Sequence, residues 1–294
     1  MHARADLYLQ LMRLDRPVGT LLLLWPTLAA LWIAADGMPP WPLIVVFTIG
    51  TFVMRSAGCV INDFADRGWD RDVERTRDRP LTTGRVSEQE ALVLFAALAA
   101  IAALLLIFLN PLARWLALGG FALAVIYPFM KRWTYLPQVV LGAAFSWALI
   151  MAFASVRDAV PAEAWLLYVG SLLWIVSYDT LYAMVDRDDD LVVGIKSTAI
   201  LFGQADRLMV GLLQASALLT LLLLGEQMGY GPAYRLGLAV MAVLFIYQQR
   251  LIRGRDRAAC FQAFRNNVWV GFAFFCGVVL ETVALPLLAA GEAS

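Results

Sequence analysis

The stretch WPLIVVFTIGTFVMRSAGCVINDFADRGWD, residues 41–70, decides the fold class and contains the first candidate site. Residues 41–62 are almost entirely apolar, and a helix needs about 20 such residues to cross a bilayer. The stretch then ends in NDFADRGWD, residues 62–70, which holds an amide and three carboxylates. The sequence therefore places oxygen-bearing side chains at the end of a predicted transmembrane helix.

The composition of the whole chain agrees with a membrane protein. Of 294 residues, 61% are hydrophobic and 16% are charged, whereas soluble domains have about 25% charged residues. The mean hydropathy is +0.72. The formal net charge is zero, which gives no electrostatic reason to expect nucleic acid as a partner. His2 is the only histidine, so a histidine metal site is excluded.

Apolar segments of spanning length occur nine times along the chain, separated in several places by breakers such as GMPP, NP and YGP. The predicted spans are 17–35, 41–62, 88–109, 113–130, 135–154, 163–183, 207–225, 234–250 and 267–288. We therefore predict an all-α polytopic bundle of nine transmembrane helices, in which residues 1–294 form one membrane-embedded domain in contact with the lipid bilayer.

Basic residues predict the orientation of these spans. If the N-terminus lies inside, nineteen lysines and arginines fall in inner loops and three in outer loops, while Arg55 lies within a span. Inner loops of membrane proteins carry the excess of lysine and arginine. We therefore expect a cytoplasmic N-terminus, an external C-terminus and acidic motifs on the cytoplasmic side.

The acidic residues form two columns at helical spacing. The first column is Asn62, Asp66 and Asp70, which share one face if the helix continues past the span. The second column, within YDTLYAMVDRDDD (178–190), is Asp179, Tyr182, Asp186 and Asp190. The motifs at 62–70 and 179–190 lie 120 residues and four spans apart. This offset predicts two pseudo-repeated halves whose acidic helices run in the same direction.

Two facing carboxylate columns suit a hard divalent cation. Mg²⁺ prefers oxygen ligands and is usually held by one or two carboxylates together with substrate phosphates. Basic side chains nearby can bind the remaining phosphate oxygens, and these are Arg67, Arg71, Arg75, Arg77, Lys131, Arg132 and Lys196. A solvated acidic loop would explain either motif alone, but it explains two columns in register poorly. The pattern indicates a diphosphate site at the membrane surface.

The motifs resemble those of the UbiA superfamily of intramembrane prenyltransferases. Residues 55–81, RSAGCVINDFADRGWDRDVERTRDRPL, are similar to its first signature, NDxxDxxxD. Residues 178–190 are similar to its second signature, DxxxD, and GIKSTAILFG (194–203) is similar to the usual continuation. RPVGTLLLLWPT (16–27), YPFMKRWTYLPQ (127–138) and FRNNVWVG (264–271) resemble the branch of 4-hydroxybenzoate polyprenyltransferases of ubiquinone biosynthesis. The resemblance covers nearly the whole chain.

This resemblance implies a nine-helix bundle, Mg²⁺ dependence and a pocket that opens to lipid. The implied metal ligands are Asn62, Asp66, Asp70, Asp179, Asp186 and Asp190, of which Asp66, Asp70, Asp179 and Asp186 are the candidate catalytic residues. The implied substrate-binding residues are Arg55, Asn62, Arg67, Lys131, Arg132, Tyr182 and Lys196.

The implied partners are a polyprenyl diphosphate and 4-hydroxybenzoate, and the implied location is the bacterial inner membrane. The reaction would be electrophilic substitution ortho to the phenol hydroxyl. Arg55 lies seven residues before Asn62, on nearly the same helix face and roughly 10 Å deeper. A charge within a span is a functional candidate, and Arg55 is predicted to pair with the acceptor carboxylate, although snorkelling to the surface is an alternative.

Two other functions share some of these features. A prenyltransferase for a naphthoate, a homogentisate or a haem would keep the same metal signatures. A cation-coupled transporter would also place acids among spans, but transporter sites usually lie near the bilayer midplane between inverted repeats. Here the acids lie at helix ends and the offset predicts parallel repeats, which favours the enzyme.

The predicted topology can be tested with reporter fusions at Arg85 and at the C-terminus, Ser294. Because the basic residues place the 63–87 loop inside and Ser294 outside, the two fusions are expected to report opposite sides of the membrane. Signals from the same side would contradict the count of nine spans.

Overall fold

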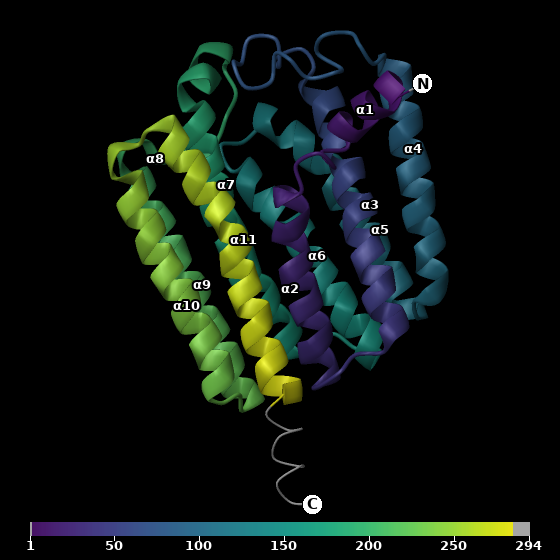
Figure 1. The fold of residues 1–294 in the computed structure, drawn as a ribbon, viewed down its shortest axis with the longest axis vertical. Coiled ribbons are helices and arrows are strands. Elements are labelled where there is room, and N and C mark those ends of the chain that lie inside the picture. The colour runs from purple at the N-terminus through teal and green to yellow at the C-terminus, as the bar shows by residue number, and fades with distance from the viewer. Residues whose placement is uncertain (1, 285–294) are drawn as a thin grey trace, which may run out of the picture.

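The computed structural model describes residues 2–284, and these residues form helices and loops without a strand (Figure 1). The long helices are α2 (Val18–Ala35), α3 (Trp41–Asp66), α4 (Glu88–Leu105), α5 (Pro111–Ile126), α6 (Pro137–Arg157), α7 (Ala162–Val193), α9 (Asp206–Met228), α10 (Pro232–Leu251) and α11 (Arg257–Val279). The short elements are α1 (His2–Leu11), η1 (Leu106–Phe108), η2 (Tyr127–Arg132), α8 (Thr198–Phe202), η3 (Gly203–Ala205), η4 (Ile252–Gly254) and the π-helical η5 (Leu280–Ala284).

Within residues 2–284, nine helices are long and apolar enough to cross a membrane, which confirms the predicted class. The predicted bounds differ most where polar residues continue a helix. α3 runs to Asp66 and α7 to Val193, both beyond the apolar segment, because their acidic columns stay helical. α11 begins at Arg257, ten residues before the predicted start, and residues 285–288 of that prediction lie outside the described part of the chain.

Local signals set several helix ends. Ser87 and Glu90 form a reciprocal capping box at the start of α4, and the Asn110 side chain accepts a hydrogen bond from the Ala113 N–H at the start of α5. Gly194 and Gly229 follow α7 and α9 with φ of 78° and 69°. Glycine adopts this left-handed conformation without steric cost, so both helices end there.

The centre of the bundle is formed by α2, α6, α7 and α11, which pack against one another. Trp174 of α7 is 1% exposed, and its indole N–H donates to the side-chain oxygen Oδ1 of Asn267 in α11 over 2.8 Å. α4 and α5 lie at the periphery with little of their surface buried. Their outward residues, including Leu104 and Trp115, are apolar and more than half exposed, as expected for contact with lipid.

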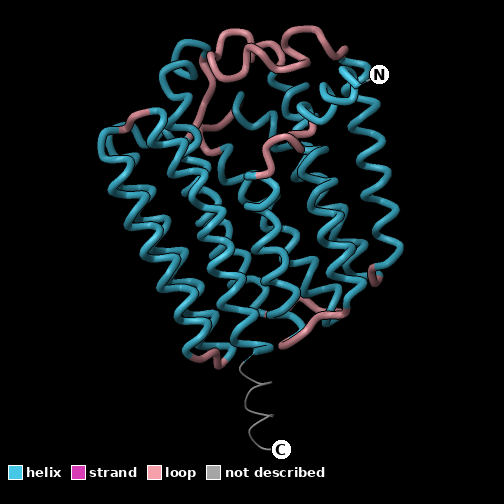
Figure 2. Tube along the Cα trace, in the orientation of Figure 1, coloured by secondary structure: helices cyan, strands magenta, loops and turns pink. Residues whose placement is uncertain are grey.

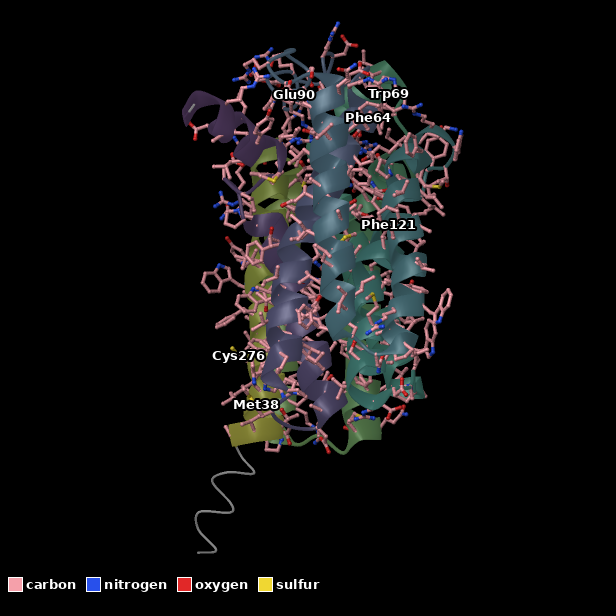
Figure 3. The ribbon with its side chains drawn as sticks, turned by 90° about the vertical axis from the view of Figure 1, so that its right-hand side faces the viewer. Met38, Phe64, Trp69, Glu90, Phe121 and Cys276 are labelled. Atoms are coloured by element: carbon pink, nitrogen blue, oxygen red, sulfur yellow. The ribbon has the colours of Figure 1, made fainter. Side chains whose placement is uncertain are left out.

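Both acidic motifs lie at the same end of the bundle. α1, the long 67–87 loop and α8 cover this end, at the top of Figures 1 and 2, while the described chain ends at the opposite side. In Figure 3, Glu90 and Trp69 lie at the end with the loop, and Met38 and Cys276 lie toward the other end. The parallel orientation predicted for the two acidic helices is therefore found, and their carboxylates meet at one membrane surface.

Candidate functional site

One cavity of about 1640 Å³ joins the two acidic columns. Its walls come from α2, α3, α4, α5, α6, α7 and α11, and the 67–87 loop covers its polar end. All six predicted metal ligands line it. A pocket for an ordinary small ligand measures about 300–1,000 Å³, so this cavity has room for a larger substrate.

The first column begins on the last turns of α3. The Asn62 side-chain amide donates to Asp66 Oδ2 over 2.9 Å, and Lys131 Nζ lies 2.5 Å from the same oxygen. Asp66 is only 4% exposed, and its Oδ1 has no hydrogen-bond partner among residues 2–284. Since buried carboxylate oxygens are normally paired, Asp66 retains one strong acceptor for a ligand.

Asp70 lies beyond the end of α3, so the first column is helical only as far as Asp66. A turn after α3 positions Asp70, because the Asp70 N–H donates a hydrogen bond to the Asp66 carbonyl over 3.0 Å. The Asp70 carboxylate pairs with Arg79 Nη1 at 2.9 Å. Burial raises the pKa of Asp70, and the positive charge of Arg79 opposes that rise.

The second column lies wholly within α7, as the spacing predicted. Arg75 from the loop forms a two-pronged ion pair with Asp186, with Nη2 2.6 Å from Oδ2 and Nε 2.9 Å from Oδ1. The Arg75 guanidinium also lies over the Tyr182 ring, 4.6 Å from its centroid. Asp179 lies deeper and Asp190 nearer the helix end, and both line the cavity.

The acidic side chains share the cavity without forming a compact cluster. Within residues 2–284, no three histidine, cysteine, aspartate or glutamate side chains are close enough to hold one metal ion. The partners of the carboxylates explain the spacing, because Asp66, Asp70 and Asp186 each turn toward a basic side chain. A bound cation would have to compete with these ion pairs.

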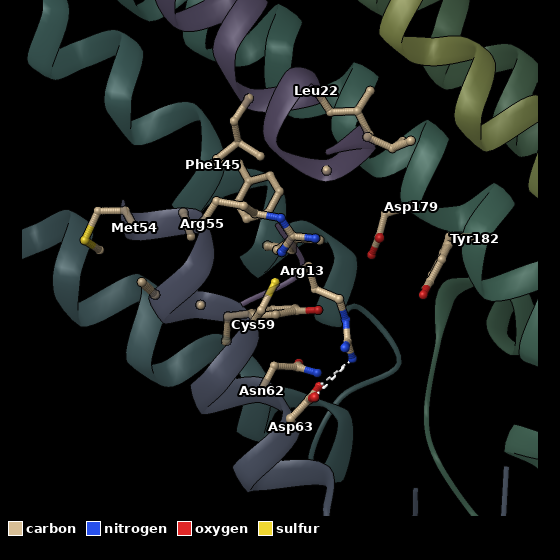
Figure 4. Close-up of a pocket in the computed structure, with 18 of the residues that line it drawn as sticks. Arg13, Leu22, Met54, Arg55, Cys59, Asn62, Asp63, Phe145, Asp179 and Tyr182 are labelled. Atoms are coloured by element: carbon tan, nitrogen blue, oxygen red, sulfur yellow. Dashed lines mark hydrogen bonds and ion pairs between the residues drawn. The ribbon is translucent and has the colours of Figure 1, made fainter. Parts of the chain in front are cut away.

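Arg55 points into the deeper part of the cavity from α3, as shown in Figure 4. No carboxylate in residues 2–284 pairs with it, and its buried Nε lacks a hydrogen-bond partner there. The guanidinium carbon lies 5.7 Å from the Phe145 ring centroid. A Cβ at Gly19 would lie 2.5 Å from Arg55 Nη2, so any larger residue at position 19 would displace the guanidinium from this place.

The other predicted binding residues divide into two groups. Lys131, Tyr182 and Lys196 line the cavity, and Lys196 reaches it from the segment after α7. Arg67 and Arg132 are not among its lining residues. Arg67 pairs with Glu88 at 2.8 Å, and Arg132 donates to the Ala65 carbonyl over 2.9 Å.

Sequence reasoning missed an ion network beside the first column. Asp63 is 2% exposed and pairs with Arg13 at 3.0 Å and Arg79 at 2.9 Å. Arg79 Nη1 bridges Asp63 and Asp70, so this network fixes the turn that carries Asp70. The Arg13–Asp63 pair is drawn in Figure 4. The position of Asp63 next to Asn62 could have indicated a role for it at the site. Asp63 does not fit the four-residue spacing of the column, so the sequence pattern did not select it.

The end of the cavity remote from the carboxylates is apolar. Residues of α4, α5 and α6 line it, including Ala99, Ala102, Leu118, Phe121 and Met151. α4 and α5 follow each other in the chain, and the rings of Phe95 and Phe121 stack between them with centroids 6.3 Å apart, but their backbones come close mainly near η1. This arrangement leaves an apolar chamber beside the lipid-facing helices.

Comparison with known proteins gives a consistent assignment. The profile of the UbiA prenyltransferase family matches residues 23–284. The 4-hydroxybenzoate octaprenyltransferase of Marinobacter nauticus is 56% identical over 96% of both chains. The apo structure of a UbiA homolog from Aeropyrum pernix K1 is 25% identical with a TM-score of 0.79, covering 89% of this chain and 97% of that one. A UbiA homolog from Archaeoglobus fulgidus bound to GPP and Mg²⁺ shares the fold, with 18% identity and a TM-score of 0.66 over 92% of this chain and 99% of that one.

The Asp63 network predicts a stability difference between two acidic substitutions. Asp63→Ala removes the carboxylate that pairs with Arg13 and Arg79 in a buried setting, and such a loss costs about 3–5 kcal/mol. Glu88→Ala breaks the exposed pair with Arg67, which contributes at most about 1 kcal/mol. Thermal unfolding of the two variants in the same detergent is expected to show a clearly larger loss for Asp63→Ala. Equal midpoints would contradict a structural role for the network.

Proposed function

The chain belongs to the UbiA prenyltransferase family, and from this premise we propose that it transfers a polyprenyl group from a polyprenyl diphosphate to 4-hydroxybenzoate. The ring carbon ortho to the hydroxyl accepts the group, in a step of ubiquinone biosynthesis. One observation carries the proposal: one cavity among the predicted spanning helices joins paired carboxylate columns, an apolar chamber and Arg55, whose buried Nε has no partner in residues 2–284. Each part matches one portion of the two substrates.

The carboxylate end fits a diphosphate together with Mg²⁺. The side chains there offer carboxylate oxygens and one amide as metal ligands. Asp66 Oδ1 is buried and has no hydrogen-bond partner in residues 2–284, so it is available to a ligand. The residues that would hold the metal are Asn62, Asp66, Asp70, Asp179, Asp186 and Asp190. Bound Mg²⁺ would neutralise charge on the leaving diphosphate. The Archaeoglobus fulgidus homolog with GPP and Mg²⁺ supports this use of the fold.

The basic residues at the same end would bind the phosphate oxygens. Lys131 pairs with Asp66, and Arg75 pairs with Asp186. If a metal ion bound these carboxylates, the two basic side chains would be free to bind phosphate oxygens instead. Lys196 stands at the cavity edge, with its Nζ 5.5 Å from the Tyr135 ring centroid. Arg67 and Arg132 remain candidates for the outer phosphate, from positions outside the cavity lining.

The apolar chamber would hold the prenyl tail. Small side chains such as Ala99, Ala102 and Ala117 keep the chamber wide. Leu118 and Phe121 supply apolar contacts. Burial of an isoprenoid chain against such walls is favourable, at about 25 cal/mol for each Å² removed from water. The lipid-facing position of α4 and α5 places this chamber beside the bilayer from which the tail arrives.

Arg55 would bind the carboxylate of the acceptor. A carboxylate that enters the membrane interior needs a cationic partner, because an unpaired buried charge is very costly. The Arg55 guanidinium can donate two parallel hydrogen bonds, and Gly19 leaves space beside it. Its place below Asn62 on α3 would bring the acceptor ring under the diphosphate.

The chain's own residues then have three tasks in the reaction. Cleavage of the C–O bond sends its electron pair to the diphosphate and leaves an allylic cation, which faces the aromatic walls of Tyr178, Tyr182 and Phe145. Exclusion of water protects that cation until the ring carbon attacks it. Loss of the ring proton restores aromaticity, and a cavity aspartate is the proposed acceptor for that proton.

The membrane orientation and domain organisation follow as part of the proposal. The end of the bundle with α1 and the 67–87 loop carries most of the basic residues, which supports a cytoplasmic N-terminus and site in the bacterial inner membrane. Residues 1–294 act as one domain, since the cavity takes its walls from both halves of the chain. A naphthoate, a homogentisate or a haem is the alternative acceptor, and the assay with 4-hydroxybenzoate distinguishes between them.

The function is tested by incubating purified protein with 4-hydroxybenzoate, a polyprenyl diphosphate and Mg²⁺, followed by mass spectrometry of the products. Prenylated 4-hydroxybenzoate and pyrophosphate are expected from the wild type. Asp66→Ala and Asp186→Ala each remove a proposed metal ligand, and both are expected to lose at least about 100-fold in rate, which corresponds to about 2.7 kcal/mol of lost transition-state stabilisation. Near-normal turnover in both variants would favour a solvated acidic loop, and a cation transporter would give no prenylated product.

The role of Arg55 is tested by steady-state kinetics with each substrate varied in turn. Arg55→Ala is expected to raise KM for 4-hydroxybenzoate by at least about tenfold, because hydrogen bonds to a charged group contribute about 1.5–3 kcal/mol. KM for the prenyl diphosphate should change much less. Gly19→Ala displaces the guanidinium without removing it and should weaken acceptor use in the same direction. Arg16→Ala and Arg132→Ala serve as controls, and an unchanged acceptor KM in Arg55→Ala would exclude Arg55 as the anchor.

A further inference from the structure

A second groove, of about 480 Å³, lies between α9 and α10, separate from the cavity described above. Small and apolar side chains line most of its length, including Gly211, Ala215, Leu218, Ala242 and Phe245. Ile246 on its rim is 54% exposed, so the groove opens toward the surroundings of the bundle. Because both helices are predicted to span the membrane, these surroundings are lipid.

Three arginines stand at one end of this groove, namely Arg207, Arg250 and Arg253. None of them pairs with a carboxylate of residues 2–284. The adjacent acid, Asp206, is fully buried and already accepts ion pairs from Arg187 and Arg255. The end of the groove therefore carries uncompensated positive charge.

The geometry of Arg207 adds a second observation. Its Nε is buried and has no hydrogen-bond partner in the described residues, although its Nη1 donates to the Arg253 carbonyl over 3.3 Å. A buried guanidinium N–H without an acceptor is unusual, since such donors are nearly always satisfied. An anionic oxygen at this point would supply the missing acceptor.

A chain of side-chain amides joins the helices that form the groove. Gln249 donates to Gln214 over 3.1 Å, Gln214 to Gln248 over 2.8 Å, and Gln248 to Asn266 over 2.9 Å. Gln214 and Gln248 are buried, and these bonds join α9, α10 and α11. Hydrogen-bonded polar side chains between transmembrane helices stabilise a fixed separation, so the groove is a lasting feature of the fold.

We propose that this groove binds an anionic phospholipid of the bilayer, with its phosphate on the three arginines and an acyl chain along the apolar wall. α9 starts and α10 ends at the arginine end, so the charges lie where lipid headgroups meet the helices. Basic pockets between transmembrane helices at a membrane surface recognise anionic headgroups. The apolar length of the groove favours a whole lipid over free phosphate, which has no use for Leu218 or Phe245.

Native mass spectrometry of the purified full chain tests this site. Phosphatidylglycerol and phosphatidylcholine with identical acyl chains are titrated separately, with inorganic phosphate as a third arm. Wild-type protein is expected to bind phosphatidylglycerol at least about fivefold better, the gain expected from one basic residue near an anionic surface. Arg250→Gln combined with Arg253→Gln removes two of the three arginines and should lower this ratio by at least about fivefold.

Two matched variants separate the parts of the proposal. Arg4→Gln combined with Arg85→Gln removes two exposed arginines from α1 and the 67–87 loop, and it should keep the preference for phosphatidylglycerol. Ala242→Trp fills the apolar wall while leaving the three arginines, and it should lower phosphatidylglycerol binding at least about fivefold, because an acyl chain then loses its contact area. Retained prenyl transfer shows that each variant is folded. If the Arg250→Gln/Arg253→Gln variant does not fold, Arg253→Gln alone takes its place.

Three results would overturn the proposal. Equal binding of the two lipids by the wild type would exclude recognition of the anionic headgroup. An equal loss in the Arg4→Gln/Arg85→Gln control would show that total charge, and not this groove, selects the lipid. Displacement of phosphatidylglycerol by inorganic phosphate together with no effect of Ala242→Trp would show a phosphate site without a lipid chain.

Discussion

The cost of burying carboxylates inside an apolar bundle governs the arrangement of the site. An unpaired charge in a low-dielectric interior is very unfavourable, so every buried acid needs a cation within reach. Asp66 has Lys131, Asp186 has Arg75, and Asp63 and Asp70 share Arg79. The positions of these basic residues are thus consequences of where the acids lie. The same pairs balance the charge of the carboxylates at the polar end of the cavity.

These ion pairs also connect parts of the chain that the membrane spans separate. The acids belong to α3, α7 and the turn after α3, whereas Arg75 and Arg79 come from the 67–87 loop and Lys131 comes from η2. The loop follows the first acidic motif, yet Arg75 pairs with Asp186 of the second. Charge balance therefore holds the two halves of the chain together over the polar end of the cavity. The apolar packing of α2, α6, α7 and α11 fixes the rest of the bundle independently.

Most of the fold was predictable from the sequence because spanning helices are set by length and hydropathy. The nine spans and the direction of the two acidic helices are confirmed, since four spans necessarily return the chain to the same side. Helix ends were less predictable. Hydropathy cannot show that α7 continues through DRDDD or that α11 starts at Arg257, because polar residues that face a cavity or water can stay helical.

Spacing predicted the site most directly where the residues share a helix. Spacing along α7 gave the second column, and the same reasoning gave Asn62 and Asp66, but Asp70 depends on a turn held by Arg79. The pairings of Asp63 join residues up to fifty positions apart in sequence, and no local pattern encodes such contacts. Gly19 is a similar case, since its role becomes visible only when α2 and α3 lie side by side.

The two anionic substrates impose a final constraint, which the depth of Arg55 satisfies. A diphosphate and a benzoate carboxylate repel each other strongly in a medium of low dielectric constant. Each therefore requires its own positive charge, and these charges must lie at different levels of the cavity. Arg55 is two helical turns from Asn62 on α3, a rise of roughly 10 Å. Because Arg55 is free of carboxylate partners within residues 2–284, its charge is not shared with the diphosphate end. In the proposed complex, the reacting carbon atoms would lie between two separately neutralised anions, in the zone where Phe145, Tyr178 and Tyr182 face the cavity.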